Sequence, residues 1–204
     1  MSIQFPGSRS YSSPAIRKYA IGFAAILAFS ACWLIVPEVC IQKGQSAAAS
    51  RIAAETALIR GDLWARAAAF AQPGEPSWQL SASRHAVGLE PIDARSWLSL
   101  ARASMSAEPA KAAAELKMSF YTGPAEDQLI SGYLTIIPRL DLSSDDELQY
   151  LLERQIDKIL HHHPDLQPAL IAMYRQTSLQ NQSLIEKLVA TTQPQFAPEL
   201  KAAR

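Results

Sequence analysis

The sequence has few cysteines and no surplus of either charge. It has two cysteines among 204 residues, and 19 basic side chains balance 19 acidic ones. Cys32 and Cys40 both fall near the amino end, so no disulfide can join two parts of the later chain. Three bases and no acid occur before residue 37, which leaves 19 acids against 16 bases in the rest. Because phosphate neutralisation needs clustered Lys and Arg, we expect no nucleic-acid partner.

Motifs for catalysis, cofactors and metals are also missing. There is no glycine-rich phosphate loop after a strand and no Gly-x-Ser-x-Gly elbow. The run Ser144–Glu147 matches a helix capping box, which accounts for its acids without an acid–base pair. The run His161–His163 precedes a proline, and adjacent helical residues point about 100° apart, so these imidazoles cannot chelate one ion together. We expect no enzyme, no cofactor and no metal site.

One long uncharged run stands near the amino end. Tyr19–Val36 has 18 residues without a charge, at the short end of what crosses a hydrocarbon core of about 30 Å. Arg17 and Lys18 precede it, and cytoplasmic flanks carry the excess of such residues. We therefore expect a single-pass protein of a bacterial inner membrane, with the amino end cytoplasmic and the body periplasmic. A cleaved signal peptide is the alternative, although Ala47–Ala49, the nearest small-residue site, lies far beyond the run.

Small residues form a stripe on this predicted membrane helix. Ala20, Ala24 and Ala28 are spaced four residues apart and share one face. Small side chains let two helices approach closely in a bilayer. The stripe predicts a packing surface within the membrane, for a second copy in a homodimer or for another membrane protein.

The remaining chain has the pattern of an all-α protein. No stretch alternates β-branched and polar residues, whereas helical spacing of apolar residues recurs throughout. Helices are expected over 47–60, 62–71, 78–89 and 108–121, with another capped by Asp93. Pro124 is expected to open a further helix, and more helices follow after residue 144.

Residues 47–124 resemble tetratricopeptide repeats. Ala86, Leu89 and Pro91 match the end of one repeat. The next repeat is matched by Trp97, Leu100 and Ala101 in its first helix, Ala112 or Ala113 in its second, and Pro124 at its close. Gly61, Asp62 and Phe70 resemble the turn between the helices and the second helix of an earlier repeat. The distance from Trp97 to Pro124 is one residue short of the consensus, and Arg66 stands where a small residue is usual. The resemblance implies stacked helical hairpins without chemistry of their own, closed by residues 125–204 as a cap.

The whole chain is also similar to single-span, tetratricopeptide-like proteins of proteobacterial envelopes, some of which accompany polysaccharide synthesis and export. The expected organisation is therefore a cytoplasmic tail (1–18), a transmembrane helix (19–37), a linker (38–46), helical hairpins (47–124) and a helical region (125–204).

These patterns predict a membrane-anchored periplasmic scaffold that binds a protein partner in a cell-envelope assembly. Trp64, Trp97 and Tyr121 are the candidate residues of a partner groove, because aromatic side chains are enriched at binding hot spots. The expected partners are a periplasmic or membrane-embedded protein and the lipid bilayer itself. The alternative is a structural accessory subunit whose transmembrane helix packs against a multi-span transporter or polymerase.

Overall fold

The computed structural model describes residues 14–43, 47–56, 59–70 and 75–202, apart from some side chains within the helices. In these ranges every regular element is helical, which confirms the all-α class. The α-helices are α1 (Pro14–Lys43), α2 (Ala47–Thr56), α3 (Gly61–Ala69), α4 (Pro76–Leu89), α5 (Ala94–Ala107), α6 (Pro109–Thr122), α7 (Ile130–Ile136), α8 (Asp146–His162), α9 (Gln167–Gln176), α10 (Leu179–Thr192) and α11 (Ala197–Ala202). Short 3₁₀ turns η1 (Asp127–Leu129), η2 (Ile137–Arg139) and η3 (Pro164–Leu166) connect the later ones.

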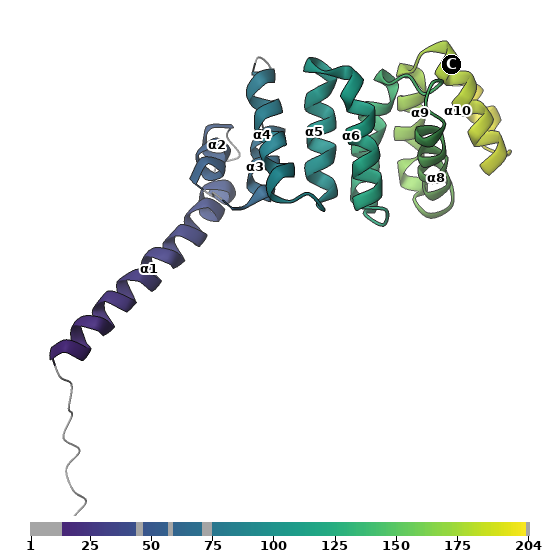
Figure 1. The fold of residues 1–204 in the computed structure, drawn as a ribbon. Helices are drawn as coiled ribbons and strands as arrows, with labels where there is room; N and C mark the ends of the chain where they lie inside the picture. The colour runs from purple at the N-terminus through teal and green to yellow at the C-terminus, as the bar shows by residue number, and fades with distance from the viewer. Residues whose placement is uncertain (1–13, 44–46, 57–58, 71–74, 203–204) are drawn as a thin grey trace, which may run out of the picture.

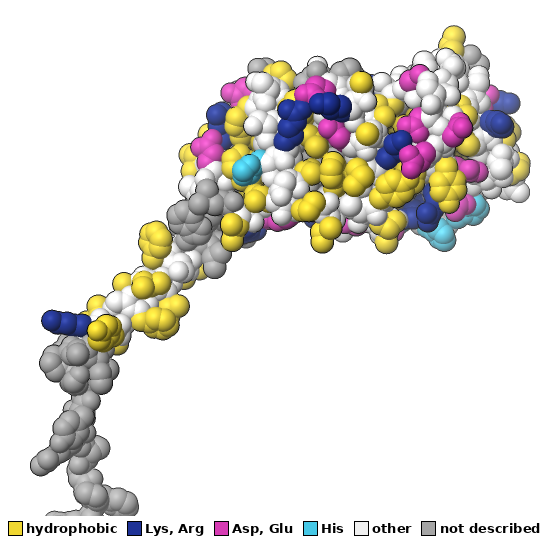
Figure 2. Space-filling view, viewed as in Figure 1, with side chains coloured by type: hydrophobic (Ala, Val, Ile, Leu, Met, Phe, Trp, Pro, Cys, Tyr) yellow, Lys and Arg dark blue, Asp and Glu magenta, His cyan; other side chains and the backbone are white. Residues whose placement is uncertain are grey.

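The helices after α2 stand side by side in a row, and α1 projects from one end of it (Figure 1). The described apolar side chains of α1 are exposed, whereas both signs of charge are interspersed over the row (Figure 2). The most extensive packing joins α5 to α6, α3 to α4 and α4 to α5. Short loops between neighbours make these pairs antiparallel hairpins.

The transmembrane helix predicted over residues 19–37 is contradicted. In the part of the chain that the structure describes, no helix is long and apolar enough to cross a membrane. The same finding contradicts the predicted location as a single-pass protein of the inner membrane with a periplasmic body.

Two successive helix pairs repeat at a spacing of 33 residues. Trp64 lies in the first turn of α3, and Trp97 occupies the same place in α5, 33 residues later. Pro76 and Pro109 begin α4 and α6 at the same spacing. Proline suits the first helical position because its missing N–H would have no partner there. The repeating unit of this chain is thus one hairpin, α3 with α4 and then α5 with α6.

This arrangement corrects the predicted register of the first hairpin. Gly61 and Asp62 were expected to lie in the turn between two helices of one repeat, over 47–60 and 62–71. The structure places them at the start of α3, which is the first helix of a pair with α4. The 33-residue spacing of the tryptophans was present in the sequence and indicates the observed register.

In each pair the start of the first helix contacts the end of the second. The Gly61 amide donates a hydrogen bond to Glu90 Oε1 over 3.0 Å, and a Cβ on this glycine would lie 2.8 Å from the Ala86 carbonyl oxygen. In the next pair, a Cβ on Gly123 would lie 2.4 Å from the Cβ of Ala94. Both contacts leave no room for a side chain on the glycine, so glycine sets how closely each hairpin closes.

Replacing Gly123 with alanine is expected to lower the free energy of unfolding by about 1–2 kcal/mol, because the added methyl group must push α5 and α6 apart. Gly88 in α4 is the control: nothing lies within 4 Å of its Cβ position, so Gly88→Ala should be neutral or stabilising. Urea unfolding followed by circular dichroism measures both. Equal effects of the two substitutions would contradict close packing at Gly123.

The second half of the row holds the main hydrophobic core. Side chains from α5 through α11 join in one buried cluster, and its largest fully buried members include Tyr133, Tyr174 and Leu152. A buried hydrogen bond of 2.8 Å from Asn181 Nδ2 to the Leu140 carbonyl fixes α10 against the loop before α8. Residues 125–202 therefore form a continuation of the row that shares its core with α5 and α6.

Two predicted helix starts are displaced. The N-cap of α8 is Asp145, whose carboxylate accepts a hydrogen bond from the Leu148 amide over 2.9 Å. Ser144 instead donates to Asp141, so the predicted capping box does not form. The helix expected to open at Pro124 is replaced by a turn and η1, and α7 begins only at Ile130.

Candidate functional site

Three surface hollows lie along the two sides of α5. The first, of about 260 Å³, is lined by Asp62, Ala65 and Arg66 of α3 together with Glu90, Asp93 and Arg95. The second, of about 510 Å³, is lined by Asp93, Arg95 and residues 125–128. The third, of about 370 Å³, is lined by Arg102, Met105, Thr135, Ile136 and Arg139. We call these three hollows together the α5 groove; the first two share Asp93 and Arg95.

The sequence of α5 explains why this helix lines a groove. Its Ala94, Leu98 and Ala101 are buried in the main core, while Leu100 and Ala103 belong to a smaller buried cluster on the α4 side. What remains exposed is a narrow polar stripe that includes Arg95, Arg102 and Ser106. Residues seven and eleven positions apart share one face of a helix. The helix is therefore held between its neighbours, and the described α5 side chains that are fully exposed lie on this stripe.

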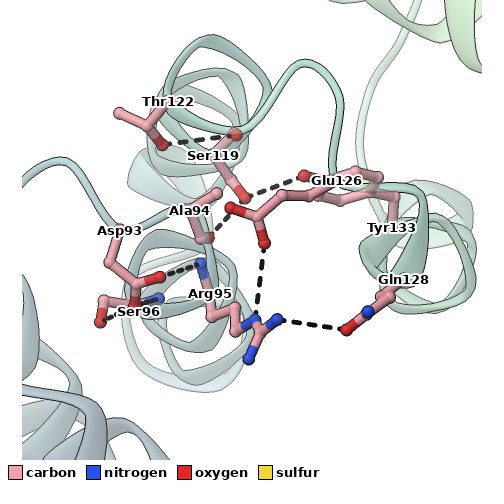
Figure 3. A network of polar contacts seen from close by, with 9 residues as sticks. All are labelled: Asp93, Ala94, Arg95, Ser96, Ser119, Thr122, Glu126, Gln128 and Tyr133. Atoms are coloured by element: carbon pink, nitrogen blue, oxygen red, sulfur yellow. Dashed lines mark hydrogen bonds and ion pairs between the residues drawn. The ribbon is translucent and has the colours of Figure 1, made fainter.

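At the second hollow the positive charge of Arg95 is neutralised (Figure 3). Its Nε lies 3.5 Å from Glu126 Oε2, and its Nη2 donates to Gln128 Oε1 over 3.1 Å. Asp93 caps α5 by accepting hydrogen bonds from the amides of Arg95 and Ser96. This cap confirms the prediction that Asp93 begins a helix.

Buried polar groups also connect α5, α6 and α7 next to the second hollow. Ser119 Oγ donates to the Ala94 carbonyl over 2.7 Å and lies 3.2 Å from the hydroxyl of Tyr133 (Figure 3). The Tyr133 ring packs on Phe120 with ring centroids 4.3 Å apart. Since α5, α6 and α7 each contribute to this contact, it fixes the spacing of the helices that border the groove.

The third hollow has the opposite electrostatic character. Arg102 and Arg139 are both exposed and line it together, and among the described residues neither guanidinium has an ion pair or hydrogen bond. Buried Ile136 and half-buried Met105 supply its apolar wall. Gly132 permits the close approach of α7, since a Cβ there would lie 2.7 Å from Leu98 Cδ2. The third hollow therefore combines two unpaired guanidinium groups with an apolar wall.

The residues predicted to form a groove lie elsewhere. Trp64 is half-buried on α3 against His85, with ring centroids 4.4 Å apart. Trp97 donates a 2.7 Å hydrogen bond to the Pro91 carbonyl. Tyr121 is exposed on α6, and its hydroxyl donates a hydrogen bond to Glu147 of α8. None of the three aromatic residues lines any of the three hollows, so the structure does not bring them together in one site.

The remaining predicted features are placed as follows. Ala20, Ala24 and Ala28 are exposed on α1. His161 pairs with Asp157 and the third histidine of the run pairs with an acid of η1, so these imidazoles point to different neighbours. Within the described ranges no three His, Cys, Asp or Glu side chains are grouped to hold a metal ion.

The sequence analysis did not single out Arg102 and Arg139. A weak signal existed for the first: Arg95 and Arg102 are seven residues apart on a helix whose other positions are mainly apolar or small. Arg139 is 37 residues further on in η2, and it reaches the same hollow because η2 continues from α7, which packs against α5.

Ion pairs along the row hold several carboxyl groups in the charged form. Lys158 Nζ lies 3.1 Å from Asp127 Oδ1 and lowers the pKa of that carboxyl. Lys117 Nζ lies 2.7 Å from Glu147 Oε2 and lowers its pKa in the same way. Glu115 is the opposite case, because burial raises the pKa of its carboxyl.

These directions predict how stability changes with pH. The contribution of Asp127 and Glu147 is fully present above their unfolded pKa values, about 4 to 4.5, and is lost as pH falls through the lower folded values. Asp127→Asn should therefore reduce the loss of stability below about pH 4.5. Glu115→Gln should be more stable than the parent at pH 7, and this difference should vanish as acid protonates Glu115. Urea midpoints measured from pH 7 to pH 3 test both, and equal slopes for all three proteins would contradict them.

No protein-family model, curated protein or solved structure matches the chain.

Proposed function

We propose that this protein is a helical scaffold, without enzymatic activity, that binds a segment of a partner protein in the α5 groove. The observation that carries this proposal is the arrangement of three hollows around one helix, two of them joined through Asp93 and Arg95. Such an elongated, open surface suits a peptide segment better than a small molecule, which usually occupies an enclosed pocket. The exposed stripe of α5 would contact the segment along its length.

The helix pairs support the same proposal. Their 33-residue spacing and their hairpin form are similar to those of tetratricopeptide repeats, which bind peptides and proteins on a surface made by successive helices. The first helices of the pairs, α3 and α5, both border the groove, and α7 borders it on the far side. Components of cell-envelope assemblies are the first partners to examine, because the resemblance of the whole sequence implies them.

A site-specific photo-crosslinker tests the groove in native cells. Benzoylphenylalanine is placed at Thr135, which is exposed and lines the third hollow, and at Ala114 on α6 as the matched exposed control. The expected result is one discrete protein adduct from position 135 and none from position 114. The adduct partner, identified by mass spectrometry and purified, should then bind the full-length protein and suppress crosslinking when in excess.

Two results would count against the proposal. Adducts of equal yield at both positions would show non-specific proximity, and no adduct from position 135 would mean that the groove is empty in the cell. Full-length protein with each substitution is checked by circular dichroism, so that a misfolded variant is not taken for a negative result.

A further inference from the structure

We propose that the third hollow is an acid-selective subsite, in which Arg102 and Arg139 together bind one carboxylate side chain of the partner segment. This inference rests on the proposed function, since it names the chemistry of the segment that the α5 groove would accept. The occupant is a peptide that carries a single Asp or Glu beside an apolar residue.

The first step of the argument is charge. The hollow is lined by two guanidinium groups and no carboxylate, and within the described chain neither guanidinium has a partner. Two other arginines of the row have a carboxylate partner: Arg84 pairs with Glu108, and Arg95 pairs with Glu126. Two unpaired like charges beside one cavity repel each other and leave a positive potential that an anion relieves. Arginine also matches a carboxylate in shape, because its fork can donate two parallel hydrogen bonds.

The second step is the apolar surface next to these charges. Met105 is half-buried and Ile136 is buried, so the hollow also offers contact to an aliphatic side chain. Thr135 adds no free donor toward an anion, because its hydroxyl donates to the Gly132 carbonyl over 2.7 Å. Binding strength at this hollow would therefore come from the two arginines and from an apolar neighbour of the acidic residue.

The third step is the contrast with the other end of the groove. In the second hollow Arg95 is neutralised, and Asp93, Glu126 and Asp127 line the same space. A second acidic residue of the partner placed there would meet like charge. The groove thus favours a segment with one acid at the Arg102 end and neutral or basic residues toward Asp93, and it disfavours a polyacidic stretch.

The probes for the test are acetyl-Leu-Glu-Leu amide, the same tripeptide with Gln in place of Glu, and inorganic phosphate. Each is titrated into the full-length protein while the Nε–Hε NMR signals of its arginines are followed. The Glu peptide is expected to shift the signals of Arg102 and Arg139 and to bind about tenfold more tightly than the Gln peptide, as loss of a charged hydrogen-bond partner predicts. The Arg95 signal should stay in place.

Matched variants make the test specific. The double substitution Arg102→Gln with Arg139→Gln should remove the tenfold preference for the Glu peptide. Arg154→Gln on α8 removes another exposed guanidinium, which lies outside the groove, and should leave that preference intact. All substituted side chains are exposed, so each variant is expected to keep its fold. Circular dichroism checks this.

The outcomes separate the two proposals. Equal affinity for the Glu and Gln peptides, or an unchanged preference in the double variant, would overturn the acid-selective subsite while a groove adduct from position 135 still supported the scaffold. Tighter binding of phosphate than of the Glu peptide would overturn the carboxylate assignment in favour of a phosphoryl group. A selective response to the Glu peptide without any groove adduct in cells would overturn the scaffold, and with it the role of this hollow in partner binding.

Discussion

Replacing Tyr133 with alanine is expected to lower the free energy of unfolding by about 3–5 kcal/mol, the range for removing a buried aromatic side chain. Tyr133 is 2% exposed and sits where α5, α6 and α7 meet. Its loss would leave a cavity against Phe120 and would remove one of the two hydrogen-bond partners of the Ser119 hydroxyl. Chemical denaturation followed by circular dichroism measures the change.

Tyr133→Phe is the control that separates packing from hydrogen bonding. It keeps the ring on Phe120 and removes only the hydroxyl, and Ser119 still donates to the Ala94 carbonyl. Its expected cost is about 1 kcal/mol. A Tyr133→Ala effect no larger than that of Tyr133→Phe would show that the ring does not hold the three helices together. Since these helices border the α5 groove, a large effect would also link groove geometry to the core.

The parts of the fold that follow local rules could be predicted from the sequence. The apolar spacing of Leu148, Leu152 and Ile156 predicts α8, and all three are fully buried in it. Asp93 caps α5 as expected, because a carboxylate one residue before a helix satisfies its first free amides. These features depend on residues within a few positions of one another.

Other features depend on contacts between distant residues and could not be predicted in this way. Ser144 and Asp145 are both good capping residues, and the choice of Asp145 coincides with its ion pair to Lys117 of α6, at 3.0 Å. The loop after Pro124 is fixed by Lys158, which donates to the Pro124 carbonyl over 2.6 Å and pairs with η1. The local residue preferences around Pro124 could not predict this contact with a lysine 34 positions away.

The candidate site shows the same limit more sharply. The aromatic residues Trp64, Trp97 and Tyr121 were selected by residue type, yet Trp64 contacts α4, Trp97 donates to the loop before α5, and Tyr121 donates to α8. Arg102 and Arg139 line one hollow because α7 lies close to α5, where Gly132 faces Leu98. Whether an arginine is paired or free depends on the three-dimensional position of acids, which the sequence does not give.

Replacing Trp97 with alanine is expected to lower the free energy of unfolding by about 2–3 kcal/mol, somewhat below the value for a fully buried tryptophan because Trp97 is half-buried. Its ring packs on the small cluster of Leu80, Leu100 and Ala103 between α4 and α5. Its indole N–H donates to the Pro91 carbonyl and so fixes the loop that precedes the Asp93 cap. Thermal or urea unfolding of the full chain measures the loss.

Trp97→Phe distinguishes a structural role from direct contact with a partner. The phenyl ring fills much of the same space and removes the hydrogen bond to Pro91, so a cost of about 1 kcal/mol in stability is expected. Because Trp97 does not line the α5 groove, the partner captured from position 135 should bind this variant with unchanged Kd. A tenfold weaker Kd in a variant of near-normal stability would instead place Trp97 at the interface, and the groove would then extend from α5 toward α4.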